Sequence, residues 1–415
     1  NAKRAGRRHE RAPRRPPPRD PRRLVVTALY LLEPEAPGAA WAPFAGVRPI
    51  AELRAGIWRI RERWEAAAGA DAVAILGTHA AAFSEGDEPP TRPPGVVDGP
   101  AVVGVAWFAP TGTPISAGAA VRRLVQGDET VGWVVPEGER WSGPHERGSA
   151  AEIDGLRLHG TYDLLTALET LLPADCADFL AAPSDGVPEG SIVLGNPSHL
   201  VCLQAKVEPG VVFDLRSGPV VVDNGSEIRS GTRLEGPTYV GPATRVLGGF
   251  VRGSVFGAEC RVRGEIAVSV FMGFANKSHD GFVGHSVVGS WVNLGAGTTT
   301  SNLKNTYGPV RLEVDGERIE TGRLNLGTLF GDHAKTAIGT MLATGTVVSA
   351  GANVFGTLTP PKYIPPFAWG CTGAERMSED GFLRVAERVM ARRNVAFSPE
   401  RRESLRQALQ RSTRP

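Results

Sequence analysis

The sequence predicts an α/β domain joined to a left-handed parallel β-helix, with helices at the C-terminal end. Strand-like and helix-like stretches alternate through the first half, which favours an α/β layer with a largely parallel sheet. A six-residue apolar period takes over after residue 197, and this period is typical of a β-helix built from hexapeptides. Glycine, at 51 of 415 residues, exceeds its usual share of about 7% and can supply the turns of such a coil.

Residues 24–190 are expected to form the α/β domain. Four apolar stretches, 25–32, 71–77, 101–108 and 130–135, are interpreted as strands. A recurrence of apolar residues at spacings of three and four predicts an amphipathic helix of about four turns, carried by Ile50, Leu53, Ile57, Ile60 and Trp64. Leucines between positions 164 and 172 predict a second helix, and the proline-rich stretch 88–95 is expected to be a loop.

Residues 197–370 carry the six-residue period. The apolar positions are Val222, Ile228, Leu234, Val240 and Val246, and small hydroxyl residues follow the first four of them at Ser226, Thr232, Thr238 and Thr244. The period resets through Phe250, Phe256, Val262, Val268 and Phe274, resets again at Phe282, Val288 and Leu294, and returns at Leu342, Val348 and Val354. Three hexads close one triangular coil, and stacked coils bury the apolar row.

Two further segments complete the chain. Between Leu294 and Leu342 the period is interrupted, and the Asp-Gly pair at 315–316 predicts a two-residue hairpin inside this excursion. A long excursion from a regular solenoid commonly lies on its functional face. Residues 372–415 predict a pair of packing or assembly helices, the first capped by Ser378 and the second beginning at Ser398-Pro399.

Composition and charge exclude several classes of protein. No run of 18 apolar residues occurs, so a membrane span is not predicted. The net charge of +2 combines +8 in residues 1–23 with −6 in the rest. That basic Pro/Arg tail is expected to be disordered rather than a nucleic-acid site, and it lacks the apolar core of a signal peptide. Four scattered cysteines without a CxxC pair argue against zinc knuckles and disulfides and favour the cytoplasm.

The residues that could carry chemistry gather between 273 and 297. Asn276, Lys277, His279, Asp280, His285 and Asn293 fall within eighteen residues, among turns. His279 lies where the repeat skips, between Lys277 and a following acidic residue, and is assigned a functional role. His285 is interpreted as structural, and His333 is left open between the two roles. Only six of the 46 basic residues are lysines, so Lys277 and Lys335 are candidates for sites that need a compact ammonium.

These motifs resemble a known family. NKSHDGFVGHSVVGSWVNLGAGTTTSNLKN (276–305) and GDHAKTAIGTMLATGTVV (331–348) look like the acyltransferase half of GlmU-type bifunctional enzymes. Those are the N-acetylglucosamine-1-phosphate uridyltransferase/glucosamine-1-phosphate acetyltransferases, and the likeness is strongest to their sugar nucleotidyltransferase relatives. RPIAELRAGIWRIRERWE (48–65) looks like the amino-terminal signature of those relatives. The resemblance covers roughly residues 24–370 and implies a nucleotidyltransferase-like first domain.

The resemblance implies roles for individual residues of the β-helix. His279 becomes the general base, and Asp280 is a candidate to hold its tautomer. Phe282 stands where the family usually has a substrate-binding tyrosine, so recognition of the sugar phosphate must differ. Asn293 is implied to bind substrate, Gly295, Ala296 and Gly297 to meet substrate and acetyl-CoA, and Lys335 to bind the cofactor. Asn276 and Lys277 join the substrate-binding set.

The chemistry of acyl transfer agrees with these roles. Attack on a thioester needs a base, which a neutral imidazole supplies near pH 7. It also needs donors for the developing oxyanion, which backbone N–H groups at glycine turns can provide. The resemblance implies a sugar phosphate and an acyl-CoA as partners, no metal in this half, and a homotrimer with sites between subunits. It gives no indication of nucleic acid or membrane as a partner.

The first domain departs from the family pattern. Sugar nucleotidyltransferases hold the triphosphate with a glycine-rich loop after the first strand and a following lysine, but that loop is absent and no lysine occurs between Lys3 and Lys206. Arg48 and Arg54 are the remaining candidates for phosphate contacts. Nucleotidyl transfer, with a nucleoside triphosphate and Mg²⁺, is therefore left open.

Two other functions remain as alternatives. A γ-carbonic-anhydrase-like enzyme would hold zinc with His279, His285 and His333. A catalytically silent scaffold or sugar-nucleotide sensor would keep the fold without turnover.

Overall fold

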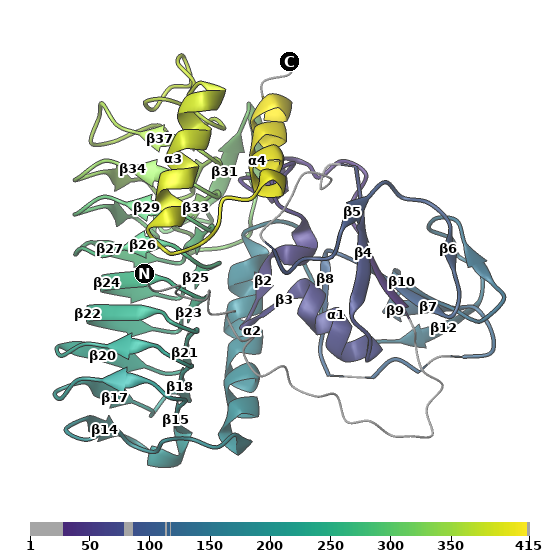
Figure 1. The fold of residues 1–415 in the computed structure, drawn as a ribbon, viewed down its shortest axis with the longest axis horizontal. Coiled ribbons are helices and arrows are strands. Elements are labelled where there is room, and N and C mark those ends of the chain that lie inside the picture. The colour runs from purple at the N-terminus through teal and green to yellow at the C-terminus, as the bar shows by residue number, and fades with distance from the viewer. Residues whose placement is uncertain (1–27, 79–85, 113, 117, 413–415) are drawn as a thin grey trace, which may run out of the picture.

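A computed structural model describes residues 28–78, 86–112, 114–116 and 118–412 of the chain. The predicted disorder of the tail 1–23 concerns residues that lie outside this part. Figure 1 shows the α/β domain on one side, a tall stack of short strands on the other, and helix α2 upright between them. Within the described residues, no helix combines the length and apolar character that crossing a bilayer requires.

The α/β domain is built on a seven-stranded mixed sheet of order β12-β9-β10-β7-β1-β4-β5. The strands are β1 (Ala28–Leu32), β4 (Ala72–Leu76), β5 (Thr91–Arg92), β7 (Ala101–Val105), β9 (Arg122–Gln126), β10 (Glu129–Val135) and β12 (Ser149–Glu152). Strands β5, β4, β1 and β7 are parallel, whereas β10 is antiparallel to both β7 and β9. The expectation of a largely parallel sheet therefore holds only for one half, and β5 lies inside the stretch expected to be a loop.

The long helix predicted over 50–64 is wrong for its first ten residues. Those residues form the 3-10 helix η2 (Ile50–Glu52) and the hairpin strands β2 (Arg54–Ala55) and β3 (Trp58–Arg59), and only then does α1 (Ile60–Ala68) begin. The five apolar residues of the pattern are all buried. Gly56 makes the hairpin turn at φ +71°, a conformation that favours glycine.

Helix α2 (Asp163–Asp178) confirms the second predicted helix, with Leu164, Leu165 and Leu168 buried. The shorter elements of the domain are η1 (Ala39–Trp41), β6 (Val97–Asp98), β8 (Phe108–Pro110), β11 (Arg140–Trp141), β13 (Gly155–Arg157) and η3 (Phe179–Ala181). Of these strands, β6 pairs with β11 and β8 pairs with β13.

The second half is a parallel β-helix with three faces. The first face stacks nine strands: β15 (Leu200–Cys202), β18 (Val220–Val222), β21 (Thr238–Val240), β23 (Val255–Phe256), β25 (Val270–Phe271), β28 (Val287–Val288), β33 (Thr328–Phe330), β36 (Thr346–Val348) and β38 (Tyr363–Ile364). The second face holds β16 (Lys206–Val207), β19 (Glu227–Ile228), β26 (Asn276–Lys277), β29 (Asn293–Leu294), β34 (Lys335–Thr336) and β37 (Asn353–Val354).

The third face holds β14 (Ile192–Leu194), β17 (Val212–Asp214), β20 (Thr232–Glu235), β27 (Phe282–Gly284), β30 (Thr299–Thr300) and β35 (Met341–Leu342). The long strands β22 (Arg245–Arg252) and β24 (Arg261–Ala267) run round the corner from the second face to the third. The 3-10 helix η4 (Pro197–His199) precedes the first face.

The six-residue period correctly predicts most of the buried row. Val222, Ile228, Leu234, Val240 and Val246 are fully buried, and so are the four hydroxyl residues between them. In the middle of the stack the assignment of Phe250, Val268, Phe274 and Phe282 to the core is wrong. Val251, Ile266, Phe271 and Val283 point inward instead. The coil there is short: Val255 pairs with Val270, only fifteen residues on.

The two halves share one apolar core. The middle, outward residues of the first face belong to the same buried cluster as the α/β domain; they include Val201, Val221, Tyr239, Val255, Val270, Val287, Leu329 and Val347. Helix α2 contacts β21 and β25. The α/β domain therefore covers the first face, and the second and third faces carry the remaining outward side chains.

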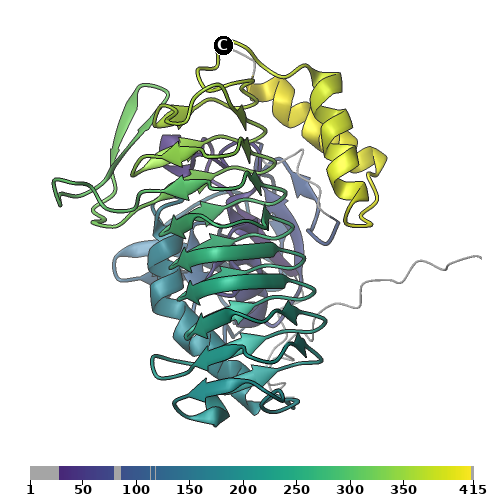
Figure 2. The same cartoon turned by 90° about the vertical axis from the view of Figure 1, so that its left-hand side faces the viewer.

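The excursion and the C-terminal segment follow the sequence predictions. Strands β31 (Arg311–Val314) and β32 (Glu317–Glu320) form the predicted hairpin, with Asp315 and Gly316 both at positive φ. Helix α3 (Glu379–Ala391) is capped by Ser378, and α4 (Pro399–Ser412) follows Ser398. Figure 2 shows these two helices packed beside the upper coils of the β-helix.

Candidate functional site

His279 lies at the corner between the second and third faces, in the turn that joins β26 to β27. Both His279 and the following Asp280 are exposed. The next coil presents the Gly295–Gly297 turn at the same corner, and the Gly297 N–H donates to the Asp280 carbonyl oxygen at 2.9 Å. The turn that carries the imidazole and the turn of the glycine motif are thus hydrogen-bonded neighbours.

Asp280 does not hold the imidazole. Its Oδ1 accepts from the Arg263 Nε at 3.2 Å, and both side chains are largely exposed. Asp280 therefore forms an ion pair with Arg263 of the neighbouring coil, in place of the predicted role of holding the His279 tautomer.

Lys277 points into the coil rather than toward a ligand. Its Cα partner in the coil below is Val262, an inward residue of the core. The ammonium donates to the carbonyl oxygens of Arg263 at 2.8 Å and His279 at 2.9 Å, and the residue is 2% exposed. Burial lowers the pKa of Lys277 to about 8, although Asp280 acts in the opposite direction. Instead of the expected contact with phosphate, the ammonium forms hydrogen bonds that hold the His279 turn against the preceding coil.

Asn276, Asn293 and Lys335 form a column on the second face. They are Cα partners in consecutive coils, and the Asn276 Nδ2 donates to the Asn293 Oδ1 at 2.8 Å. The Lys335 ammonium donates to the His333 carbonyl oxygen at 2.8 Å, and burial lowers its pKa to about 8. The structure therefore brings these three predicted residues together, in the coils that also carry the His279 and Gly295–Gly297 turns.

The glycine motif is needed first for close packing of coils. A Cβ at Gly295 would stand 2.6 Å from the Ala337 carbonyl group. The Gly295 N–H donates to the Thr336 carbonyl oxygen at 3.1 Å, and the Gly297 N–H is taken by Asp280 as described above. These two amides are committed to neighbouring coils, so they do not serve as the oxyanion donors expected from the sequence.

His285 belongs to a polar group at the next corner, between the third and first faces. Its Nδ1 lies 2.8 Å from the Asn302 Nδ2, which fits a neutral imidazole accepting at that nitrogen. The Phe282 ring lies over Gly284 and reaches toward the same amide. Sequence reasoning missed Asn302, which stands in the excursion that was expected to lie on the functional face.

The pH dependence of stability tests this arrangement. Burial lowers the pKa of His285 to about 4, so between pH 6.5 and 4 the unfolded chain binds a proton that the folded chain does not. The free energy of unfolding should therefore fall as the pH drops through this window. A His285→Gln variant should lose less stability over the same range, measured by urea unfolding at several pH values. Parallel curves for the two proteins would contradict the assignment.

His333 is a buried ring of the third corner, between the first face and the second. It is 4% exposed, and it stacks near Trp291 and contacts the edge of Phe382 of α3. The three histidines of the zinc alternative thus occupy three different corners. Among the described residues, no three His, Cys, Asp or Glu side chains are grouped to hold a metal ion.

Arg48 joins the α/β domain to the β-helix. Its Nε donates to the Asp332 Oδ2 at 2.9 Å and another guanidinium nitrogen donates to the Ser290 Oγ at 2.9 Å. The Arg48 and Asp332 side chains are 3% and 6% exposed. Arg54 likewise donates to the Met272 carbonyl oxygen at 3.1 Å and to that of Ile57. Both arginines that were expected to bind phosphate therefore connect the α/β domain to the β-helix.

The carboxyl end of β1 is the topological switch point of the sheet, because β4 and β7 lie on its two sides, and such points commonly bind ligands. Glu33 occupies it. The Glu33 carboxylate accepts from the Ile50 N–H at 2.9 Å and the Ala51 N–H at 3.0 Å. Burial raises the pKa of Glu33 to about 7. The backbone N–H groups at the start of η2 thus donate to a carboxylate of the chain itself.

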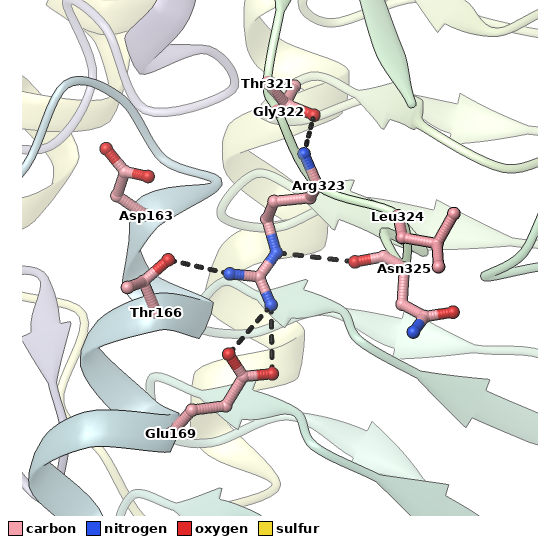
Figure 3. A pocket seen from close by; sticks show the side chains of 8 residues that line it. All are labelled: Asp163, Thr166, Glu169, Thr321, Gly322, Arg323, Leu324 and Asn325. Carbon is pink, nitrogen blue, oxygen red and sulfur yellow. Dashed lines mark hydrogen bonds and ion pairs between the residues drawn. The ribbon is translucent and has the colours of Figure 1, made fainter. Parts of the chain in front are cut away.

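A polar cavity of about 410 Å³ opens between α2 and the end of the excursion. Figure 3 shows Arg323 spanning it. The guanidinium donates to the Thr166 Oγ1 at 2.7 Å and to both carboxylate oxygens of Glu169, at 3.0 and 3.1 Å. This arginine fastens the excursion to the helix that separates the two halves.

An Arg323→Ala variant is expected to lose about 1 kcal/mol of stability, since Glu169 is half-exposed and solvent weakens the pair. Urea unfolding would measure the loss. Arg318→Ala, on the exposed part of the same hairpin, is the control and should change stability by less. Equal effects of the two substitutions would remove the fastening role.

Comparisons with known proteins agree with the fold. Residues 30–178 match the family model described as sugar nucleotidyl transferase. The bifunctional sugar-1-phosphate nucleotidylyltransferase/acetyltransferase of Sulfurisphaera tokodaii is 34% identical over 150 residues, 33% of this chain and 35% of that protein. The bifunctional protein GlmU of Methanocaldococcus jannaschii is 34% identical over 89 residues, and that of Methanococcus vannielii 36% over 89 residues.

The chain spans about a third or less of the length of the relatives it matches: each GlmU alignment covers 21% of both proteins. The predicted fold class, a nucleotidyltransferase-like domain followed by a left-handed parallel β-helix and C-terminal helices, is confirmed. These matches also confirm the resemblance to the GlmU-type bifunctional proteins, with residues 30–178 as the part that matches the sugar nucleotidyl transferase family.

Proposed function

We propose that the protein is a transferase that moves an acyl group from acetyl-CoA to a sugar phosphate or nucleotide sugar at the His279 corner. The observation that carries the proposal is the hydrogen bond between the turn of His279 and the Gly295–Gly297 turn. It sets an exposed imidazole beside the motif that the resemblance assigns to the acyl donor. The names of the relatives, which include an acetyltransferase, support the same reaction class.

The reaction would proceed by attack on the thioester carbonyl. The acceptor nitrogen or oxygen bonds to the carbonyl carbon while His279 removes its proton, and the carbon–sulfur bond then breaks. The proton passes to the sulfur, so coenzyme A leaves as the thiol. Lys277 donates to the His279 carbonyl oxygen and is therefore a positioning residue. Asn276 and Asn293, joined by their hydrogen bond, offer amides to the acceptor.

The proposal includes a homotrimer with its sites at the seams between copies. Three exposed apolar side chains support this: Ile338, Met341 and Leu358 are 77%, 56% and 60% exposed. Met341 is the Cα partner of Thr299 and donates its N–H to the Leu358 carbonyl oxygen. The patch thus adjoins the coil of the glycine motif, on faces that the α/β domain does not cover. Light scattering would give the mass of the assembly.

We assign the α/β domain a docking role instead of nucleotidyl transfer. The Glu33 carboxylate accepts the hydrogen bond of a backbone amide at the switch point. Arg48 and Arg54 donate hydrogen bonds to residues of the β-helix. A triphosphate would find no lysine from residue 4 to residue 205 to meet it. The reaction is placed in the cytoplasm, consistent with four free cysteines, three of them buried.

A substrate panel tests the function directly. Purified protein would be incubated with acetyl-CoA and a set of amino- and hydroxyl-bearing sugar-1-phosphates, and free thiol would be measured. Acceptor-dependent thiol release is the expected result. A parallel arm with nucleoside triphosphates and Mg²⁺ should release no pyrophosphate. Pyrophosphate release in that arm would overturn the docking role. Thiol release that is the same with and without an acceptor would overturn acyl transfer. Stabilisation by sugar nucleotides without turnover would favour the scaffold alternative.

A further inference from the structure

Four arginines gather near the middle of the second face, beside the end of α3. Arg245 and Arg261 are Cα partners in consecutive coils, and their inward neighbours Val246 and Val262 lie in the core. Arg392 and Arg393 follow the last residue of α3. Figure 1 shows α3 lying along the β-helix. The four arginines Arg245, Arg261, Arg392 and Arg393 are called the arginine cluster below.

The arginine cluster has too few counter-charges. Glu227 pairs with Arg245 at 3.4 Å but is shared with Arg229 at 2.8 Å. Arg261, Arg392 and Arg393 form no ion pair with any other described residue. Burial and the neighbouring guanidinium groups lower the pKa of Arg261 and of Arg393, and Glu259 opposes this at both. Excess positive charge is thus held in place by the fold.

Arg393 gives the second, independent observation. The residue is 9% exposed, and its Nε is buried with no hydrogen-bond partner among the described residues. A buried guanidinium nitrogen without a hydrogen-bond partner is costly. Guanidinium groups bind phosphate oxygens with paired, charge-assisted hydrogen bonds. A phosphate would satisfy the buried nitrogen and the excess charge together.

We propose that the arginine cluster is a binding site for the phosphate group of an anionic ligand. It stands next to the proposed reaction site, because Arg261 is the Cα partner of Asn276 in the following coil. No step of the proposed acyl transfer uses these arginines, so the inference goes beyond that function. The phosphate belongs either to a substrate bound along the second face or to a separate effector.

Binding of inorganic pyrophosphate at constant ionic strength tests the site, by calorimetry on the full chain. Wild-type protein should bind saturably, and Arg261→Gln and Arg393→Gln should each bind at least tenfold more weakly. Arg140→Gln, which removes an exposed arginine of the α/β domain, should bind as the wild type does. Arg261 is half-buried on the outside of the coil, so its variant keeps the test valid if Arg393→Gln fails to fold.

Two outcomes would overturn the proposal: pyrophosphate that does not saturate the wild type, or Arg261→Gln that binds as tightly as the control. Competition arms identify the source of the phosphate. Coenzyme A that displaces pyrophosphate where dephospho-coenzyme A does not would assign the site to the acyl donor, and displacement by a sugar-1-phosphate would assign it to the acceptor. If none of these three competitors displaces pyrophosphate, the site is assigned to a separate effector. These readouts need no turnover, so they stand or fall apart from the acyl-transfer function.

Discussion

Alanine at position 279 is expected to lower kcat for acyl transfer by about 10²–10⁴-fold, because the variant lacks the base that takes the acceptor proton. The free energy of unfolding should hardly change, since His279 is exposed. Thiol release at saturating acetyl-CoA and acceptor would measure kcat, and urea unfolding would measure stability. The two measurements together separate a chemical role from a structural one.

His159→Ala is the matched control, because His159 is an exposed histidine of the α/β domain. Its turnover should equal that of the wild type. Unchanged kcat in His279→Ala would remove the imidazole from the chemistry. A pH profile adds a second readout: the dependence of kcat on pH should differ between the variant and the wild type, because the variant lacks the base.

The β-helix was predictable because its local pattern and its tertiary contacts coincide. Each inward residue, such as Val222 or Ile228, meets the same position of the next coil, so the six-residue period is also the packing rule. The prediction failed where a coil lost residues. There the inward position moved by one, from Phe250 to Val251, and a fixed period cannot register such a shift.

The helix predicted from Ile50 failed for a different reason. Its apolar residues are buried as expected, but a hairpin and a short helix can bury the same set. The deciding contact is distant in sequence: Asp175 of α2 accepts from the Ile57 N–H at 2.9 Å. A Cβ at Gly56 would stand 2.2 Å from that carboxylate. No spacing within residues 50–64 contains this information.

The candidate site was predictable as a location and less so in its roles. The break in the repeat located the corner of His279, and the family motif added Asn293 and the glycines. The sequence pattern did not show which of these side chains point into the coil and which point outward. Lys277 stands at an inward position and Asn276 at an outward one, one residue apart, and this alternation is set by the strand. Asn302 was missed because its partner, His285, lies on another coil.

Replacing Arg48 with alanine is expected to destabilise the protein by about 3–5 kcal/mol, because it leaves the Asp332 carboxylate buried without its counter-charge. Asp332 is 5% exposed and also accepts from the Ser290 N–H at 2.7 Å. Urea unfolding would measure the loss. Arg140→Ala, which breaks an ion pair whose side chains are 76% and 70% exposed, is the control and should cost less than about 1 kcal/mol.

A double variant, Arg48→Met with Asp332→Asn, separates charge from shape. The asparagine oxygen can still accept from Ser290, and no charge remains buried, so most of the lost stability should return. Such recovery would assign Arg48 to domain docking through its pairing with Asp332. If instead Arg48→Ala unfolds no more easily than Arg140→Ala, the pair does not hold the two halves together, and a phosphate-binding role for Arg48 would again be open to test.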